Sequence, residues 1–91
     1  MTQAAAPTTL AVTVKFPLSK EKPYRADLPR TARVGDVRTA AMGHYGVADD
    51  SSYRYYLTHQ RETQPEERTL DQVAGPAHAV EFRLVKELVQ G

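Results

Sequence analysis

The chain has 91 residues, 41% of them hydrophobic, which is enough for one domain with a modest core. Its 12 basic and 11 acidic residues are spread along the chain and give a net charge of +1, so no electrostatic footprint for nucleic acid or a membrane surface is indicated. The absence of cysteine excludes disulfides, a thiol nucleophile and cysteine-based zinc sites.

The composition also bears on where the protein resides. No apolar run approaches the roughly 20 residues that span a bilayer. Residues 1–9 are small and polar and lack the basic and apolar regions of a signal peptide, so we interpret them as a disordered leader. We therefore expect a cytoplasmic protein with no membrane partner and no nucleic-acid partner.

Two strands are predicted next. Residues 10–16 alternate apolar and polar side chains, which is typical of a half-buried strand, and Pro17 ends the pattern. A polar connection over 18–22 leads to a second alternating segment at 24–28, closed by Pro29. Two strands joined by a short polar loop predict a hairpin.

The following segment predicts an amphipathic helix over about 34–45. Its apolar face recurs at three- and four-residue spacing. Asp36 lies in the first turn, where a negative charge suits the helix dipole, and Gly46 lies just past the end, as a C′ glycine does. The predicted apolar face consists of Val34, Val37, Ala40, Ala41, His44 and Tyr45.

The remaining elements alternate again. Residues 53–57 predict a third strand, and the charged segment 59–68 predicts an exposed loop with a short edge strand around 62–64. A helical turn is expected near 70–74, and residues 80–84 predict the last strand. The order of elements predicts an α+β fold in which one helix covers one face of a mixed sheet of four or five strands.

This order resembles the β-grasp fold of the ubiquitin family over about residues 10–91. The three helix anchors Val34, Val37 and Ala41 match the family's pattern, and Gly46-Val47 matches the glycine and aliphatic residue that end its helix. Other matches are the acidic turn Asp49-Asp50, the third-strand run Arg54-Tyr55-Tyr56, the Arg68-Thr69-Leu70 signature before a short 3₁₀ turn at about 70–74, and the final strand Val80–Leu84. The resemblance implies a ubiquitin-like domain over 10–85 and a flexible tail over 86–91.

The resemblance also implies a function. A terminal single glycine resembles bacterial ubiquitin-like modifiers that are encoded beside their own enzymes. Those modifiers work with an E1-like activating enzyme, an E2-like conjugating enzyme, a deubiquitinase-like protease and target proteins. The implied conjugation residue is Gly91, and Leu88, Val89 and Gln90 form the segment that the activating enzyme reads. The chain departs from most of the family because Gln90-Gly91 replaces Gly-Gly.

A second implied site is the sheet face that points away from the helix. Alternation places Arg54 and Tyr56 there if Tyr55 and Leu57 point inward. Tyrosine and arginine are frequent interface anchors, and the matching positions of the family bind partners. The alternative is a tyrosine-rich strand that is stabilised only by cross-strand pairs.

No catalytic constellation is apparent, so we expect neither an enzyme nor a metal or other cofactor. His44, His59 and His78 lack metal-ligand spacing, and the pair Ser51-Ser52 lies outside any nucleophile elbow. The pair Glu66-Glu67 lies in a predicted loop and indicates solvation.

Two other functions stay open at this stage. One is a non-conjugated interaction adaptor that uses the Arg54 and Tyr56 face. The other is a sulfur carrier with a terminal thiocarboxylate, against which Gln90 argues because such carriers end in Gly-Gly.

Overall fold

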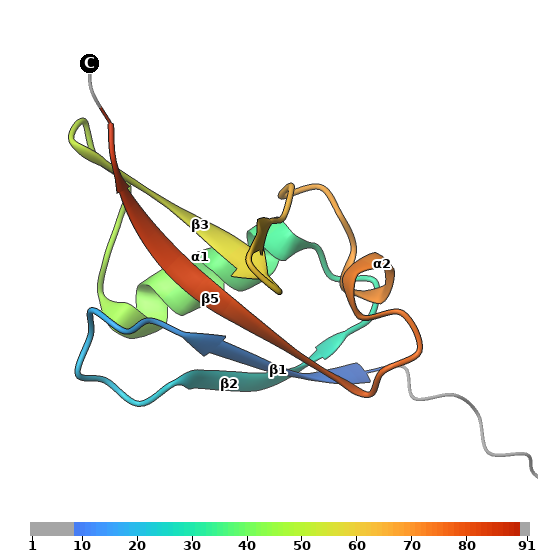
Figure 1. The fold of residues 1–91 in the computed structure, drawn as a ribbon. Helices are drawn as coiled ribbons and strands as arrows, with labels where there is room; N and C mark the ends of the chain where they lie inside the picture. The colour runs from blue at the N-terminus through green and yellow to red at the C-terminus, as the bar shows by residue number, and fades with distance from the viewer. Residues whose placement is uncertain (1–8, 90–91) are drawn as a thin grey trace, which may run out of the picture.

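The computed structural model describes residues 9–89. In chain order the elements are β1 (Thr9–Lys15), β2 (Tyr24–Pro29), α1 (Val34–Tyr45), β3 (Tyr53–His59), β4 (Glu62–Thr63), α2 (Leu70–Ala74) and β5 (Ala79–Leu88). The strands form one sheet in the order β2-β1-β5-β3-β4, and α1 lies across one of its faces (Figure 1). The predicted α+β arrangement is confirmed. No helix among residues 9–89 is long and apolar enough to cross a bilayer.

The centre of the sheet is the parallel pair of β1 and β5, which joins the two ends of the chain. Val12 lies opposite Val80, and Val14 lies opposite Phe82. All of the other strand pairs among the described residues are antiparallel. Because alternate side chains of both central strands face α1, they bury an apolar layer against the helix. This layer is made by Leu10, Val12, Val14, Val80, Phe82 and Leu84, each at most 5% exposed.

The helix α1 has the predicted bounds, and its ends explain why. The Asp36 carboxylate accepts a hydrogen bond from the Arg33 backbone N–H at 3.0 Å, which satisfies a donor that the helix leaves free. At the other end Gly46 adopts the left-handed conformation with φ 68°, and the Val47 N–H donates to the Met42 carbonyl at 3.0 Å. Glycine adopts this conformation without steric cost, so it ends the helix at Tyr45.

The buried face of α1 differs from the predicted face at three residues. One of them is Ala40, which is only half-buried. Val34, Val37 and Ala41 are buried as predicted. Met42 is buried as well, whereas His44 is exposed, and its Nε2 lies 2.8 Å from the Lys22 carbonyl oxygen. The imidazole lies at the end of α1 beside the β1–β2 loop. There it contacts a backbone carbonyl and does not enter the core.

The short helix α2 is α-helical and not the predicted 3₁₀ turn. Val73 N–H donates to Thr69 C=O at 3.2 Å, and Gly75 N–H donates to Asp71 C=O at 2.9 Å, which are bonds between residues four apart. Thr69 begins the helix through a capping box, because its hydroxyl accepts from Gln72 N–H while its own N–H donates to the Gln72 side chain. This reciprocal pair stabilises a helix of only five residues.

Arg30 fixes α2 against the loop that follows β2. Its guanidinium donates to the Asp71 carboxylate at 2.9 Å, to the Gly75 carbonyl at 3.0 Å and to the Ala77 carbonyl. Its side chain is 17% exposed, so these charge-assisted bonds are partly shielded from water. The residue therefore sets where the chain turns to enter β5.

The turn between β3 and β4 is tighter than the predicted charged loop. Thr58 pairs with Thr63 and His59 pairs with Glu62, which leaves only Gln60 and Arg61 to turn the chain. Both have positive φ, 52° and 70°, as a two-residue hairpin of this hand requires. Neither is glycine or asparagine, so the usual sequence signal of such a turn is absent.

The Tyr45 hydroxyl joins α1 to the first hairpin. It donates to the Val14 carbonyl at 2.6 Å and accepts from the Tyr24 N–H at 3.1 Å, and the residue is 8% exposed. The hydroxyl thus bridges β1 and β2 where their direct pairing ends.

We expect Tyr45→Phe to lower the free energy of unfolding by about 1–3 kcal/mol, because it leaves a buried carbonyl and an N–H without their partner. Urea denaturation monitored by circular dichroism measures this. The control is Tyr56→Phe, on the opposite face of the sheet, for which we expect a change below about 0.5 kcal/mol. Equal changes in the two variants would contradict the bridging role of the Tyr45 hydroxyl.

Candidate functional site

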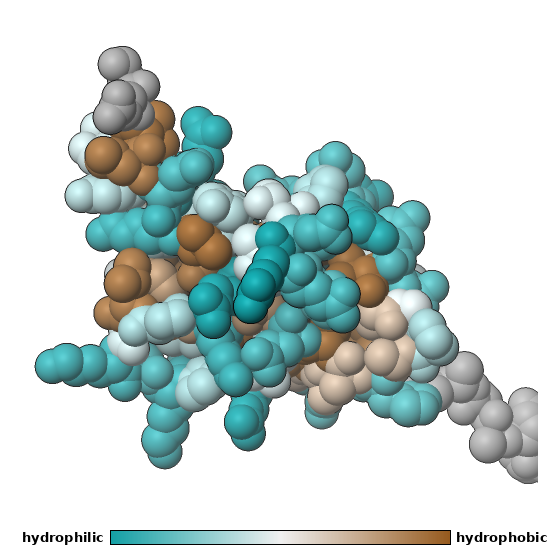
Figure 2. All heavy atoms as spheres, viewed as in Figure 1, coloured by the Kyte–Doolittle hydropathy of each residue, from teal (hydrophilic) through white to brown (hydrophobic). Residues whose placement is uncertain are grey.

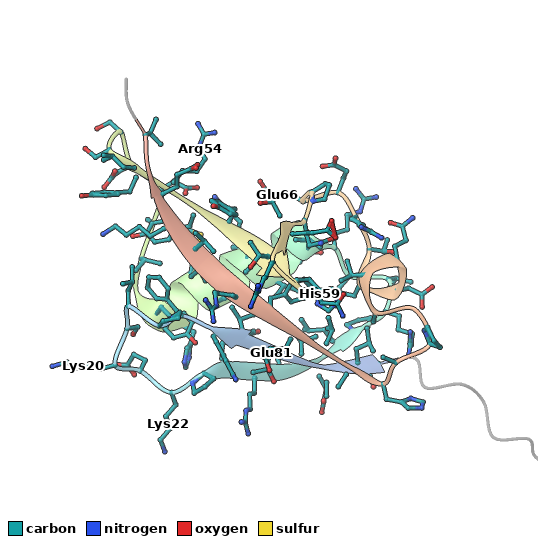
Figure 3. All side chains as sticks on the ribbon, in the orientation of Figure 1. Lys20, Lys22, Arg54, His59, Glu66 and Glu81 are labelled. Carbon is teal, nitrogen blue, oxygen red and sulfur yellow. The ribbon has the colours of Figure 1, made fainter. Side chains whose placement is uncertain are left out.

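The outer face of the sheet, away from α1, carries the predicted pair of partner-binding residues. Tyr55 and Leu57 are buried against the helix, at 6% and 1% exposure. Arg54 and Tyr56 alternate with them and therefore point outward, Arg54 exposed and Tyr56 half-buried. Figure 3 shows Arg54 near the end of the molecule from which β5 leaves the sheet. The placement agrees with the alternation, and the binding role stays a prediction.

The neighbouring strand β5 completes this surface. Glu87 lies opposite Arg54, and Val85 lies opposite Tyr56. We call these four residues the outer patch. It combines a half-buried aromatic ring, a half-buried aliphatic side chain and one charge of each sign. Such a mixture suits contact with another protein, in which the ring and the guanidinium supply anchors and the carboxylate limits the choice of partner.

The strand β5 is longer than the sequence predicts. Alternation indicates a strand over 80–84, yet Lys86 pairs with Tyr55, and Leu88 pairs with Tyr53. The Val89 N–H then donates to the Ser52 carbonyl at 2.8 Å. Lys86, Glu87 and Leu88 are all exposed, so burial imposes no apolar alternation there, while backbone pairing with β3 continues. Residues 86–88 are therefore part of the sheet and not of the predicted tail.

Side chains at this end of β5 present apolar surface. Leu88 is 58% exposed, and the Lys86 ammonium lies 4.0 Å from the centre of the Tyr53 ring. This cation–π contact holds the lysine stem along the strand. Figure 2 shows apolar side chains gathered at this end of the molecule. Leu88 and Val89, two of the predicted tail-recognition residues, thus lie at the end of the sheet, whereas Gln90 and Gly91 lie outside the described residues.

A shallow groove opens on the helix side of the same end. Leu18, in the β1–β2 loop, is 71% exposed at this groove. The groove is lined by Phe16, Leu18, Ser19, Tyr45, Val47, Tyr55 and Lys86. Sequence patterning did not indicate it, because its residues come from four separate segments.

The start of β3 is fixed by an acidic pair. The Asp49 carboxylate accepts from the Tyr55 N–H at 2.9 Å and from the Arg38 guanidinium, while Asp50 accepts from Tyr53 N–H at 2.7 Å. Partial desolvation raises the pKa of the Asp49 carboxyl. The hydrogen bonds from Tyr55 and Arg38, with the positive charges of Arg38 and Arg54, outweigh that effect and hold its pKa below the usual value.

This lowered pKa makes stability depend on pH. A carboxyl group whose pKa is lower in the folded state stabilises the fold above its unfolded pKa, near 3.8, and the gain is lost as the pH falls through the folded pKa. We expect the urea midpoint of the wild type to fall between about pH 5 and pH 2 more steeply than that of Asp49→Asn. An unchanged slope in Asp49→Asn would contradict the assignment.

Metal and catalytic groups form no cluster in the part of the chain that the structure describes. No set of histidine, aspartate and glutamate side chains in residues 9–89 is arranged to hold a metal ion. His59 Nδ1 lies 3.1 Å from the Glu81 carbonyl oxygen, and its ring packs on Phe82. That the protein is not an enzyme stays a prediction.

Several solved structures share this arrangement of strands and helices. No protein-family model matches the sequence, and no curated protein does. A ubiquitin from Caldiarchaeum subterraneum superposes with a TM-score of 0.72 at 22% identity, covering 91% of this chain and 99% of that one. The N-terminal ubiquitin-like domain of the 4931431F19Rik protein gives 0.68 at 15% identity, covering 100% of this chain and 88% of the other. A designed protein based on ubiquitin gives 0.70 at 12% identity, covering 93% and 95%.

The chain has a ubiquitin-like β-grasp fold. Because these sequence identities are low, the structural similarity shows the fold alone. The function of this ubiquitin-like protein depends on its own residues.

Proposed function

We propose that this ubiquitin-like protein is a modifier that is joined to target proteins through the carboxylate of Gly91. In the proposed pathway, of the bacterial ubiquitination-like kind, an E1-like enzyme activates the carboxylate and an E2-like enzyme transfers it. A deubiquitinase-like protease reverses the linkage. The observation that carries the proposal is the end of β5, which is held by β3 as far as Val89 and presents Leu88 to solvent.

The chemistry requires activation because a free carboxylate has a poor leaving group at neutral pH. Attack of a Gly91 carboxylate oxygen on the α-phosphorus of ATP forms an acyl adenylate and releases pyrophosphate. An enzyme thiolate then attacks the carbonyl carbon, which forms a thioester and releases AMP. A lysine amine of the target finally displaces the thiolate and forms an isopeptide bond.

The residues of this chain supply recognition and reach. Glycine has no side chain, so it can approach a catalytic centre closely in an extended conformation. Leu88 and Val89, with Gln90, form the segment that an activating enzyme would bind. Pairing of β5 with β3 already orders part of this segment, which lowers the conformational-entropy cost of binding. The outer patch would hold the body of the modifier against conjugating enzymes and receptors.

A second function remains open because partner binding through the outer patch does not depend on conjugation. Arg54 and Tyr56 belong to β3 and require no reaction at Gly91 to bind a partner. A non-conjugated adaptor would use this face alone. A sulfur carrier is a weaker alternative, since Gln90 stands where such carriers have glycine.

The experiment incubates the purified chain with ATP and the E1-like enzyme of its pathway, then measures pyrophosphate exchange and the mass of the thioester. We expect an adduct with the wild type, none after deletion of Gly91, and at least about a tenfold loss with Leu88→Glu. The control is Thr31→Glu, which places the same charge at an exposed residue of the loop between β2 and α1 and should leave activation unchanged.

Two results would contradict the modifier proposal: no adduct with the wild type, or activation that survives the deletion. The adaptor function makes a different demand on the same variants. It requires that Arg54→Glu or Tyr56→Ala abolish partner binding while deletion of Gly91 leaves it intact. Lys20→Glu, in the exposed β1–β2 loop, controls for a general effect of charge.

A further inference from the structure

The strand β2 is the longer free edge of the sheet. Among residues 9–89 it pairs with β1 alone, and the strand at the opposite edge, β4, has only two residues. Figure 1 shows β2 running along one border of the sheet. An open edge presents backbone donors and acceptors that another strand can pair with.

The backbone groups that face this free edge belong to Arg25 and Asp27. In an antiparallel pair, successive residues direct their N–H and C=O alternately toward the partner strand and away from it. Pro29, opposite Thr9, has no N–H and fits a position whose N–H would point away from β1. Arg25 and Asp27 lie four and two residues before Pro29, so their backbone groups also point away from β1. The N–H of Tyr24 points toward β1, because it donates to the Tyr45 hydroxyl, which in turn donates to the Val14 carbonyl.

The sequence of this edge is symmetric in chemical character. It reads Pro23-Tyr24-Arg25-Ala26-Asp27-Leu28-Pro29, with proline at both ends and apolar side chains one step inside them. The two charges lie one on each side of Ala26 and have opposite signs. Arg25 and Asp27 are exposed on the outer face, while Tyr24 and Leu28 are half-buried on the helix side.

We propose that β2 pairs antiparallel with β2 of a second copy of the chain, about a two-fold axis at Ala26. In this register Arg25 lies opposite Asp27 of the partner subunit, and Asp27 lies opposite Arg25 of the partner subunit. Each of these is a narrow pair that exchanges two hydrogen bonds, so the edge gains about four backbone hydrogen bonds. Tyr24 lies opposite the partner subunit's Leu28, which adds two apolar contacts on the helix side.

The charged side chains and prolines of β2 are arranged so that one kind of partner can pair with this edge. Charges and prolines on an edge usually discourage pairing, and an edge with like charges would repel a second copy. This edge carries one charge of each sign at symmetric positions, so it attracts a second copy in this register and repels one shifted by two residues. Prolines at both ends limit the length of the ladder, and the two-fold axis uses both β2 edges, which gives a closed dimer.

The dimer should be weak, because the paired segment is short and buries less than the roughly 1,200 Å² of a stable interface. It would join the two sheets into one and present two outer faces side by side. The inference goes beyond the proposed function and does not depend on Gly91, since β2 and the end of β5 are separate parts of the sheet.

Sedimentation velocity between about 10 µM and 1 mM tests the proposal, since this range brackets the affinity of a weak dimer. We expect the wild type to pass from monomer to dimer in this range. Arg25→Asp and Asp27→Arg should each raise the dimer dissociation constant at least about tenfold, because each brings like charges together. Arg54→Asp, with the same change of charge on the outer patch, should dimerise as the wild type does.

The two charge variants mixed in equal amounts give the sharpest result. Arg25→Asp leaves two acidic side chains on the edge, and Asp27→Arg leaves two basic ones. These edges are complementary, so we expect a heterodimer from two monomers. The double variant Arg25→Asp with Asp27→Arg should recover self-association. Circular dichroism of each variant checks that it is folded. A wild type that stays monomeric, single variants that dimerise normally, or a mixture that stays monomeric would each overturn the proposal.

Discussion

The parallel pairing of β1 with β5 is the constraint on which the rest of the structure depends. It joins residues near the two ends of the chain, places Val12 beside Val80, and puts both hairpins into one sheet. A shift of one residue would turn every buried side chain of β5 to the solvent, so the apolar layer fixes the register. That register then decides which residues of β5 lie opposite β3, and hence what stands on the outer patch and at the end of the sheet.

Local patterning was sufficient for most of the fold. The structure confirms the strands that alternation predicts over 10–16 and 80–84 and the helix that the anchors Val34, Val37 and Ala41 predict. Such elements can be predicted because burial on one face imposes a period on the sequence. Gly46 ends α1 through its own backbone conformation, which a sequence can indicate. These features are local, and the ubiquitin-like order of elements follows from them.

The parts that sequence reasoning missed depend on contacts between distant segments. The extension of β5 to Leu88 is set by pairing with β3 and not by burial, so no alternation indicates it. The anchoring of α2 by Arg30 joins residues more than 40 positions apart. For the candidate site, Arg54 and Tyr56 could be placed outward from their own strand, whereas Val85 and Glu87 opposite them require the register.

The strand β3 holds β5 as far as Val89, the last residue that the structure describes. Amide hydrogen exchange followed by NMR tests this directly at Val89, whose N–H donates to the Ser52 carbonyl. We expect exchange at Val89 to be at least about tenfold slower than in an unstructured peptide of the same sequence. Exchange at the unstructured rate would contradict the claim and would place the start of the tail further back, near the predicted boundary after Val85.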